Sequence, residues 1–145
     1  MKFHYRVRGI IIVEGKVLLA HQKGAGNTFL PGGHIESGEG AEAALARELF
    51  EEIGRNAIIG KFVGAVEHVF PEGEPSNHEI NLVFEADVSG LVITTAPQSL
   101  EDHIEFLWCM LTTQALQRHN LQPSPLIACL SNWGRRWGGY WGTTI

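Results

Sequence analysis

The segment that most constrains the fold of this chain is GEGAEAALARELFEEIG, residues 38–54. It lacks proline and is rich in Ala, Glu, Leu and Arg, which all favour helices. Gly54 follows the last apolar residue, at the place where the left-handed end of a helix is expected. The composition therefore predicts a helix from Glu39 to Ile53.

This helix would carry an apolar arc and an acidic arc, since successive residues lie ~100° apart around the axis. The apolar arc predicts core contacts for Leu45, Ala46, Leu49, Phe50 and Ile53. On the acidic arc, Glu48, Glu51 and Glu52 occupy positions i, i+3 and i+4, where like charges cost about 0.2–0.5 kcal/mol per pair. A divalent cation would offset that repulsion, because hard cations such as Mg²⁺ prefer carboxylate oxygens. A solvated acidic face is the simpler alternative.

The residues around the helix favour the cation. Upstream lies LPGGHIESGE, in which two glycines allow the backbone to approach a charged ligand closely. From Gly33 to Gly54 the chain follows the pattern G-x5-E-x7-REL-x-EE-x-G. This pattern resembles the signature of the Nudix hydrolases, and every fixed position of that signature is filled. One departure follows it, because Arg55 stands where the family usually has an aliphatic residue. Arg55 affects the expected local packing more than the expected chemistry.

The resemblance implies hydrolysis of a phosphoanhydride bond with the help of Mg²⁺, or of Mn²⁺ in its place. It implies that Glu48, Glu51 and Glu52 are metal ligands and that the backbone carbonyl of Gly32 also reaches a metal. Arg47 is implied to pair with acids such as Glu51 and to orient them for catalysis, which suits the planar fork of a guanidinium.

Three further signature residues, Gly33, Glu39 and Gly54, are implied to support the geometry of the loop and the helix. Their expected role is to hold the metal ligands in place.

The general base is open on the sequence alone. Crowded carboxylates can have raised pKa values, which suits proton transfer near neutral pH, so Glu51 and Glu52 are catalytic candidates. In several relatives the base comes from a loop outside the signature, and Glu101 in the loop Pro97–Ile104 resembles that residue. Glu79 and Glu105 are alternatives, and Glu101 could also be a solvated loop acid.

Size and charge indicate one domain, residues 1–145, with a net charge of −5. That charge offers no general basic surface for nucleic acid, and no apolar run approaches the ~20 residues of a membrane helix. The N-terminus lacks the features of a signal peptide. Cys109 and Cys129 lie in apolar stretches and are predicted to be reduced thiols in the core. We therefore expect a cytoplasmic protein.

The remaining segments are predicted to be mostly strands, with Glu14-Gly15 as a hairpin turn and Gly60 and Gly64 as bulges. The expected strands are Tyr5–Val13, Lys16–His21, Phe29–Leu30, Ile58–Phe70, Asn81–Val88 and Glu105–Leu111, and the expected later helices are Thr112–Gln117 and Ser124–Trp133. This mixture predicts an α/β fold, an α/β/α sandwich with a mixed sheet. The resemblance implies the same fold, with the signature loop and helix in its cleft.

Several residues are candidates for substrate binding. A proline at a set distance beyond the signature marks many ADP-ribose hydrolases of the family, and Pro71 stands there, although it also suits the turn PEGEP. His78, with His68 and Asn81, could contact a phosphate or a base. Phe29, with Phe70 and Trp108, could stack on a nucleobase.

Three functions fit these observations. The first is a pyrophosphohydrolase for a nucleoside diphosphate linked to X, with ADP-ribose or another nucleotide sugar as substrate. The second is a (d)NTP pyrophosphatase that cleans the nucleotide pool. The third is a nucleotide-binding module without catalysis, which the intact acids disfavour. The Trp/Arg-rich tail that begins at Trp133 could cover the sheet, contact another subunit or bind an anion. Packing or a subunit contact is expected, since homodimers are common among relatives.

Overall fold

The computed structural model describes all residues except 1, 71–76 and 135–138. Helix α1 (Ala41–Ile53) is the signature helix, and it begins two residues later than the sequence predicts. It ends at Gly54, which has φ of 77° and donates its backbone N–H to the carbonyl of Phe50. The predicted left-handed end of this helix is confirmed.

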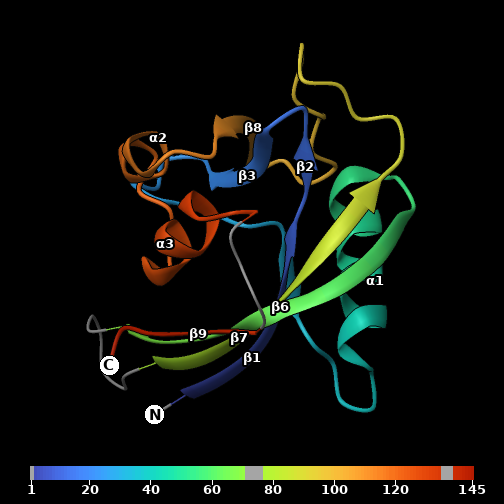
Figure 1. Cartoon of the computed structure of the whole chain (residues 1–145). Coiled ribbons are helices and arrows are strands. Elements are labelled where there is room, and N and C mark those ends of the chain that lie inside the picture. Colours follow the sequence, from blue (N-terminus) through green and yellow to red (C-terminus); the bar gives the residue numbers. More distant parts are fainter. Residues whose placement is uncertain (1, 71–76, 135–138) are drawn as a thin grey trace.

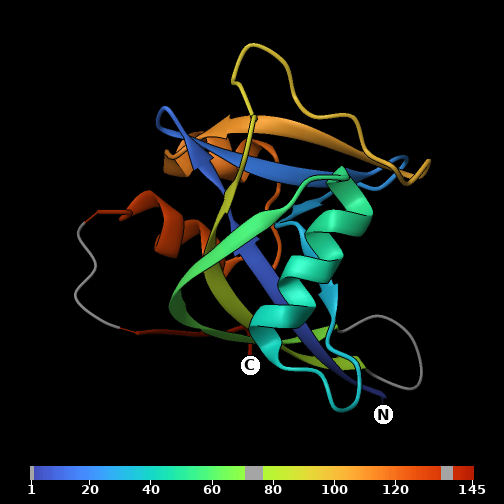
Figure 2. The same ribbon diagram turned by 90° about the vertical axis from the view of Figure 1, so that its right-hand side faces the viewer.

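The strands form two sheets (Figures 1 and 2). The larger sheet is mixed and has the order β5-β1-β7-β6-β9. Its strands are β1 (Lys2–Ile10), β5 (Gly32–His34), β6 (Ala57–Phe70), β7 (Asn77–Val88) and β9 (Tyr140–Thr143). β1 runs parallel to β7, and β6 runs antiparallel to β7 and parallel to β9.

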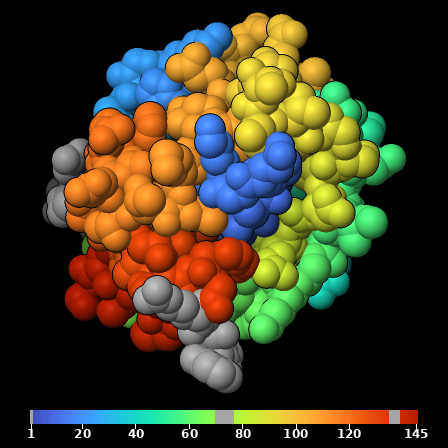
Figure 3. All heavy atoms as spheres, turned by 45° about the horizontal axis from the view of Figure 1, so that its top comes forward, coloured from blue at the N-terminus to red at the C-terminus, as the bar shows by residue number. Residues whose placement is uncertain are grey.

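The second sheet is built around β3 (Lys16–Gln22), which pairs with β8 (Ile104–Met110) along its whole length. The short strands β2 (Ile12–Val13) and β4 (Thr28–Phe29) pair with the two ends of β3. The turn between β2 and β3 is the predicted hairpin, with positive φ at Glu14 and Gly15. Figure 3 shows this hairpin in blue beside the segment after β7 in yellow.

Helix α1 covers one face of the larger sheet, and α2 (Thr113–Arg118) and α3 (Pro125–Ser131) lie on the other side (Figures 1 and 2). Leu45 and Leu49 of α1 pack with Val7 and Phe84 in one core, and Leu116 of α2 belongs to a second core. The predicted α/β fold with a mixed sheet is confirmed. Among the described residues, no helix is long and apolar enough to span a bilayer.

The predicted core face of α1 is partly wrong. Phe50 is 54% exposed, whereas Glu52 is buried together with Leu45, Leu49 and Ile53. The helix is therefore turned so that the edge of its acidic arc faces inward. A broad apolar arc does not specify which part of it contacts the sheet, because the position of the partner strands decides that.

Two strands were not predicted. β5 contains Gly32 and Gly33 and lacks the alternation of a strand, and β9 lies in the C-terminal tail, where Tyr140 Oη donates to the carbonyl of Pro125. Residues 140–143 of the tail therefore extend the sheet at β6 by strand pairing. The predicted bulges near Gly60 and Gly64 appear as register shifts between β6 and β7. Cys109 and Cys129 are buried in the second core, as predicted.

Candidate functional site

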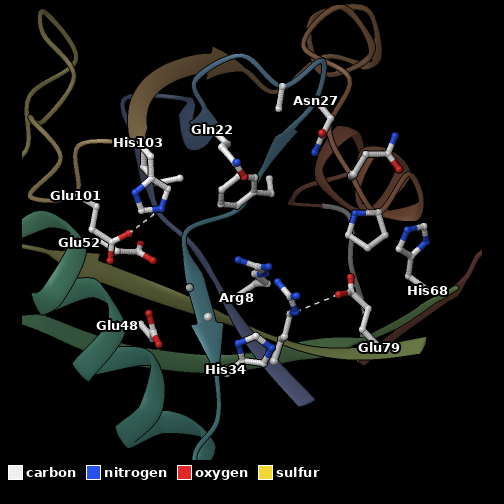
Figure 4. Close-up of a pocket in the computed structure, with 18 residues that line it drawn as sticks. Arg8, Gln22, Asn27, His34, Glu48, Glu52, His68, Glu79, Glu101 and His103 are labelled. Atoms are coloured by element: carbon white, nitrogen blue, oxygen red, sulfur yellow. Dashed lines mark ion pairs between the residues drawn. The ribbon is translucent and has the colours of Figure 1, made fainter. Parts of the chain in front are cut away.

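A cavity of about 430 Å³ lies between α1, the β7–β8 loop and strands β1, β4 and β5 (Figure 4). Glu48, Glu52 and Glu101 line one side, which we call the acidic wall. Arg6 and Arg8 also line the cavity, with Arg8 near its middle (Figure 4), and we call these two residues the basic wall. The volume is within the ~300–1,000 Å³ of typical small-molecule sites.

Glu52 is the most buried residue of the acidic wall, with 7% of its surface exposed. Its Oε2 atom is buried and has no hydrogen-bond partner among the described residues. Burial, followed by the nearby charge of Glu48, raises the pKa of the Glu52 carboxyl to about 8. An ionised Glu52 therefore needs a positive partner that the described side chains do not fully supply.

Glu48 lies one turn before Glu52 on α1 and faces β5. Burial also raises the pKa of Glu48, against the opposing effect of Arg47. A Cβ atom on Gly33 would lie 2.5–2.6 Å from the Glu48 carboxylate. Glycine at this position of β5 thus leaves space for the Glu48 carboxylate. The position favours glycine because a side chain would clash, and its backbone conformation does not require glycine.

Arg47 joins the signature loop to the helix. Its Nε and Nη2 atoms donate to the Glu39 carboxylate at 2.7 and 2.9 Å, and Nη2 also donates to the carbonyl of His34 at 3.0 Å. Its Nη1 atom donates to Glu48 at 3.0 Å and to Glu51 at 3.3 Å. The guanidinium therefore separates two helix carboxylates and ties the loop to them.

Glu51 lies outside the cavity. Its side chain is exposed and its carboxylate is directed to Arg47. Among the described residues, no three acidic, histidine or cysteine side chains converge into a complete metal site. The role of Glu51 as a ligand stays a prediction, and it requires the carboxylate to leave Arg47.

Glu101 is brought to the acidic wall by its loop. The backbone N–H of Leu100 donates to the carbonyl of Glu52 at 2.8 Å, and the Leu100 side chain lies against Gly54. The charge of Glu101 helps raise the pKa of Glu48 and of Glu52, so Glu101 lies near both carboxylates. His103 Nε2 lies 3.6 Å from Glu101 and also lines the cavity.

The other two candidates for the general base lie elsewhere. Glu105 is exposed and pairs with His21 at 2.9 Å on β3, outside the cavity. Glu79 lies at the end of the cavity opposite the acidic wall, beside Arg6 (Figure 4). Of the three, Glu101 alone joins the acidic wall.

The basic wall was not recognised in the sequence. Arg6 and Arg8 are two residues apart on β1 and so share one face of the strand, a pattern that could have indicated them. Arg8 is buried, donates to the carbonyl of Leu30 at 3.1 Å and lies 5.3 Å from the centre of the Phe29 ring. Burial lowers the pKa of Arg8 to about 10, so the side chain is a cation at neutral pH.

Only some of the remaining candidates for substrate binding lie at the cavity. Phe29 and His68 line the cavity, whereas His78 does not and lies 3.9 Å from Glu67. Trp108 points away and donates its Nε1 hydrogen to the carbonyl of Val92, which fixes the β7–β8 loop. Pro71 lies outside the described residues, as does the side chain of Phe70.

The chemistry of the acidic wall suits a divalent cation, although its three carboxylates do not converge on one point in the described structure. It offers carboxylate oxygens, which hard cations prefer, and it includes a buried oxygen of Glu52 without a partner. Gly32, with φ of 146°, places its backbone beside this wall, and a backbone hydrogen bond of Gly32 lowers the pKa of Glu52 in part. A cation here would relieve the repulsion among three carboxylates.

Comparison with known proteins decides the family. A sequence model of the NUDIX domain matches residues 2–128 of this chain. The chain belongs to the Nudix family. A Nudix protein, the MutT NUDIX hydrolase from Burkholderia pseudomallei, has a crystal structure that matches with a TM-score of 0.73 at 23% identity, covering 92% of this chain and 99% of that one. That likeness confirms the Nudix fold.

Two curated relatives of this Nudix chain have named activities. The ADP-ribose pyrophosphatase from Methanocaldococcus jannaschii is 38% identical over 87 residues, 58% of this chain and 50% of the relative. The CTP pyrophosphohydrolase from Escherichia coli K12 is 39% identical over 69 residues, 45% of this chain and 51% of the relative. The chain thus spans about half the length of both relatives. Nudix hydrolases act on phosphoanhydride bonds and generally use divalent metal ions.

Proposed function

We propose that this Nudix protein is a divalent-metal-dependent pyrophosphohydrolase that cleaves a nucleoside diphosphate linked to X. The observation that carries the proposal is the pairing of an acidic wall and a basic wall in one cavity. A diphosphate is an anion that needs both a cation and positive side chains to balance its charge. Glu48 and Glu52 of the acidic wall can hold the cation, and Arg6 and Arg8 supply the positive side chains.

In this proposal Glu48, Glu52 and the carbonyl of Gly32 would hold the cation, and Glu51 would join them only if its carboxylate turned away from Arg47. A bound Mg²⁺ or Mn²⁺ neutralises phosphate charge and acidifies a water molecule. Arg47 keeps the helix acids in place through its contacts with Glu39 and Glu48.

Glu101 is the proposed general base. Its carboxylate is less enclosed than that of Glu52 and faces the acidic wall from the β7–β8 loop, so it can accept the proton of the attacking water. Glu52 is the alternative, because its buried carboxylate lines the same cavity and one of its oxygens has no hydrogen-bond partner among the described residues.

ADP-ribose and other nucleotide sugars are the first substrates to test, because the relative from Methanocaldococcus jannaschii is named for ADP-ribose. The CTP pyrophosphohydrolase supports a second candidate, hydrolysis of nucleoside triphosphates. The products differ, since ADP-ribose yields two monophosphates and a triphosphate yields pyrophosphate with a monophosphate. A cytoplasmic location and a homodimer belong to the same proposal.

A substrate panel with Mg²⁺ tests the proposal. ADP-ribose, other nucleotide sugars, the (d)NTPs and dinucleoside polyphosphates would each be incubated with the protein, and phosphate would be measured with and without an added phosphatase. Turnover of at least one compound is expected, and Glu52→Gln should lower it by about 10²–10⁴-fold. Turnover of triphosphates alone would favour nucleotide-pool cleaning, and no turnover with any cation would contradict catalysis.

A further inference from the structure

Glu79 of β7 has a feature that hydrolysis itself does not explain. It lies at the end of the cavity opposite the acidic wall, and only 3% of its surface is exposed (Figure 4). Its Oε2 atom lies 3.1 Å from Arg6 Nε, yet both atoms lack an aligned hydrogen bond among the described residues. This carboxylate oxygen is thus paired with Arg6 by charge, and no described residue gives it an aligned hydrogen bond.

The carboxylate of Glu79 is held rigidly from behind. Asn81 Nδ2 donates to Glu79 Oε1 at 3.0 Å, and Asn81 Oδ1 accepts from Arg8 Nε at 3.3 Å. Asn81 is fully buried, so the contact that holds Glu79 from behind is closed to water. Leaving a buried polar oxygen unsatisfied is costly, and a ligand that supplies an N–H would remove the cost.

The position of Glu79 indicates which part of a nucleotide it would meet. The phosphates belong between the acidic and basic walls, and the base is the far end of a nucleotide from its phosphates. Asn27 lies on the side of the cavity away from the acidic wall, as Glu79 does (Figure 4), and Gln122 and the aromatic ring of Phe29 also line the cavity. Carboxamides and an aromatic ring are groups that bind the edge and the face of a nucleobase.

An ionised carboxylate accepts hydrogen bonds and cannot donate them. It therefore attracts an exocyclic amino group and repels a carbonyl oxygen at the same place on the base. We propose that Glu79 accepts a hydrogen bond from an exocyclic amino group, so that the site selects cytosine or adenine nucleotides over uracil or hypoxanthine nucleotides. This inference rests on the proposed function and names the class of base that the same site takes.

Binding of nucleoside monophosphates, which are expected products, tests this without turnover. Calorimetric titration in the presence of Mg²⁺ would compare CMP with UMP and AMP with IMP, two pairs that differ at the amino position. Wild-type protein should bind the amino member of at least one pair about tenfold or more tightly, the size expected for one hydrogen bond to a charged group. Glu79→Gln, which keeps the shape and adds a donor, should abolish or reverse that ratio.

Glu85→Gln is the matched control, because Glu85 lies on the same face of β7 but lines a different cavity. It should leave the ratio unchanged. Circular dichroism and the unfolding midpoint would show that Glu79→Gln is folded, and the kcat/KM ratio of cytidine over uridine substrates provides a second readout.

Several results would overturn the inference. Equal affinity of the wild-type protein for CMP and UMP, and for AMP and IMP, would overturn it. An equal loss of affinity for both nucleotides of a pair in Glu79→Gln would also overturn it, because Glu79 would then act only by positioning Arg6. A strong preference for CMP over dCMP without a preference over UMP would assign Glu79 to the ribose. If the base preference is found but no compound is hydrolysed, the proposed function fails while base selection stands. Failure to bind any nucleotide would reject both.

Discussion

At the scale of single residues, Glu52 shows a conflict between stability and function. A carboxylate that lies inside the protein with an unpartnered oxygen destabilises the fold when it is ionised. Glutamine would keep the shape and remove the charge. The presence of an acid at this position is explained if its charge is used, which is what a cation site requires.

The pH dependence of stability tests this view of Glu52. The pKa of Glu52 is raised to about 8 in the folded protein from the ordinary value of 4.5. The folded state then binds more protons than the unfolded state between these values, so the free energy of unfolding should fall as pH rises from about 5 to about 8. The loss would be on the order of a few kcal/mol in metal-free buffer.

Denaturant unfolding of wild type and Glu52→Gln at several pH values measures this effect. The free energy of unfolding of Glu52→Gln should not show the decrease that ionisation of Glu52 causes in wild type. The difference in this free energy between the variant and wild type should therefore grow as pH rises from about 5 to about 8. Glu42→Gln in the exposed first turn of α1 is the control. Parallel curves for wild type and Glu52→Gln would show that Glu52 is not the titrating group.

At the scale of elements, the signature loop and α1 act as one unit because Arg47 joins them. Lysine in place of Arg47 would keep the charge but lose the paired contacts with Glu39 and the contact with the carbonyl of His34. We expect Arg47→Lys to lower kcat/KM by about 10–100-fold, as for other residues that orient metal ligands.

The control for Arg47→Lys is Arg55→Lys, since Arg55 donates to the carbonyl of Ser89 at 3.2 Å and lies outside the cavity. Steady-state kinetics on the best substrate of the panel provides the measurement. An Arg47→Lys enzyme as active as Arg55→Lys would show that the paired geometry is unnecessary.

A second prediction for the signature loop and α1 concerns Gly33. A methyl group at this position would meet the end of the Glu48 side chain, which can move, rather than backbone. Gly33→Ala should therefore lose about tenfold or more in metal affinity while its unfolding midpoint changes little. Gly139→Ala, where an added Cβ meets nothing within 4 Å, is the control. A large fall in the midpoint without a loss of affinity would contradict this explanation.

The elements differ in how well the sequence predicts them. The helix and the β2–β3 hairpin depend on local signals, a cap glycine and a two-residue turn, and both were predicted. β5 and β9 depend on partners far away in the chain, since β5 pairs with β1 and β9 with β6. Phe50 was misplaced for the same reason, because only the packed sheet decides which arc of α1 is buried.

At the scale of the whole molecule, the cavity is assembled from separate parts of the chain. The signature supplied Glu48 and Glu52, which are neighbours on one helix and could be predicted together. Arg6 and Arg8 come from β1, and Glu101 comes from a loop that α1 holds by one backbone hydrogen bond. No local sequence pattern indicates that these segments lie close together. The basic wall could therefore be identified only from the structure.

The measurement that tests this assembly most directly is Mn²⁺ binding followed by electron paramagnetic resonance. Titration of wild type, Glu52→Gln and Glu85→Gln at one pH gives the affinity of each for the ion. If the acidic wall holds the cation, Glu52→Gln should bind Mn²⁺ at least about tenfold more weakly than the other two, because one charged ligand is lost. Equal affinities in all three proteins would contradict a metal site at the acidic wall.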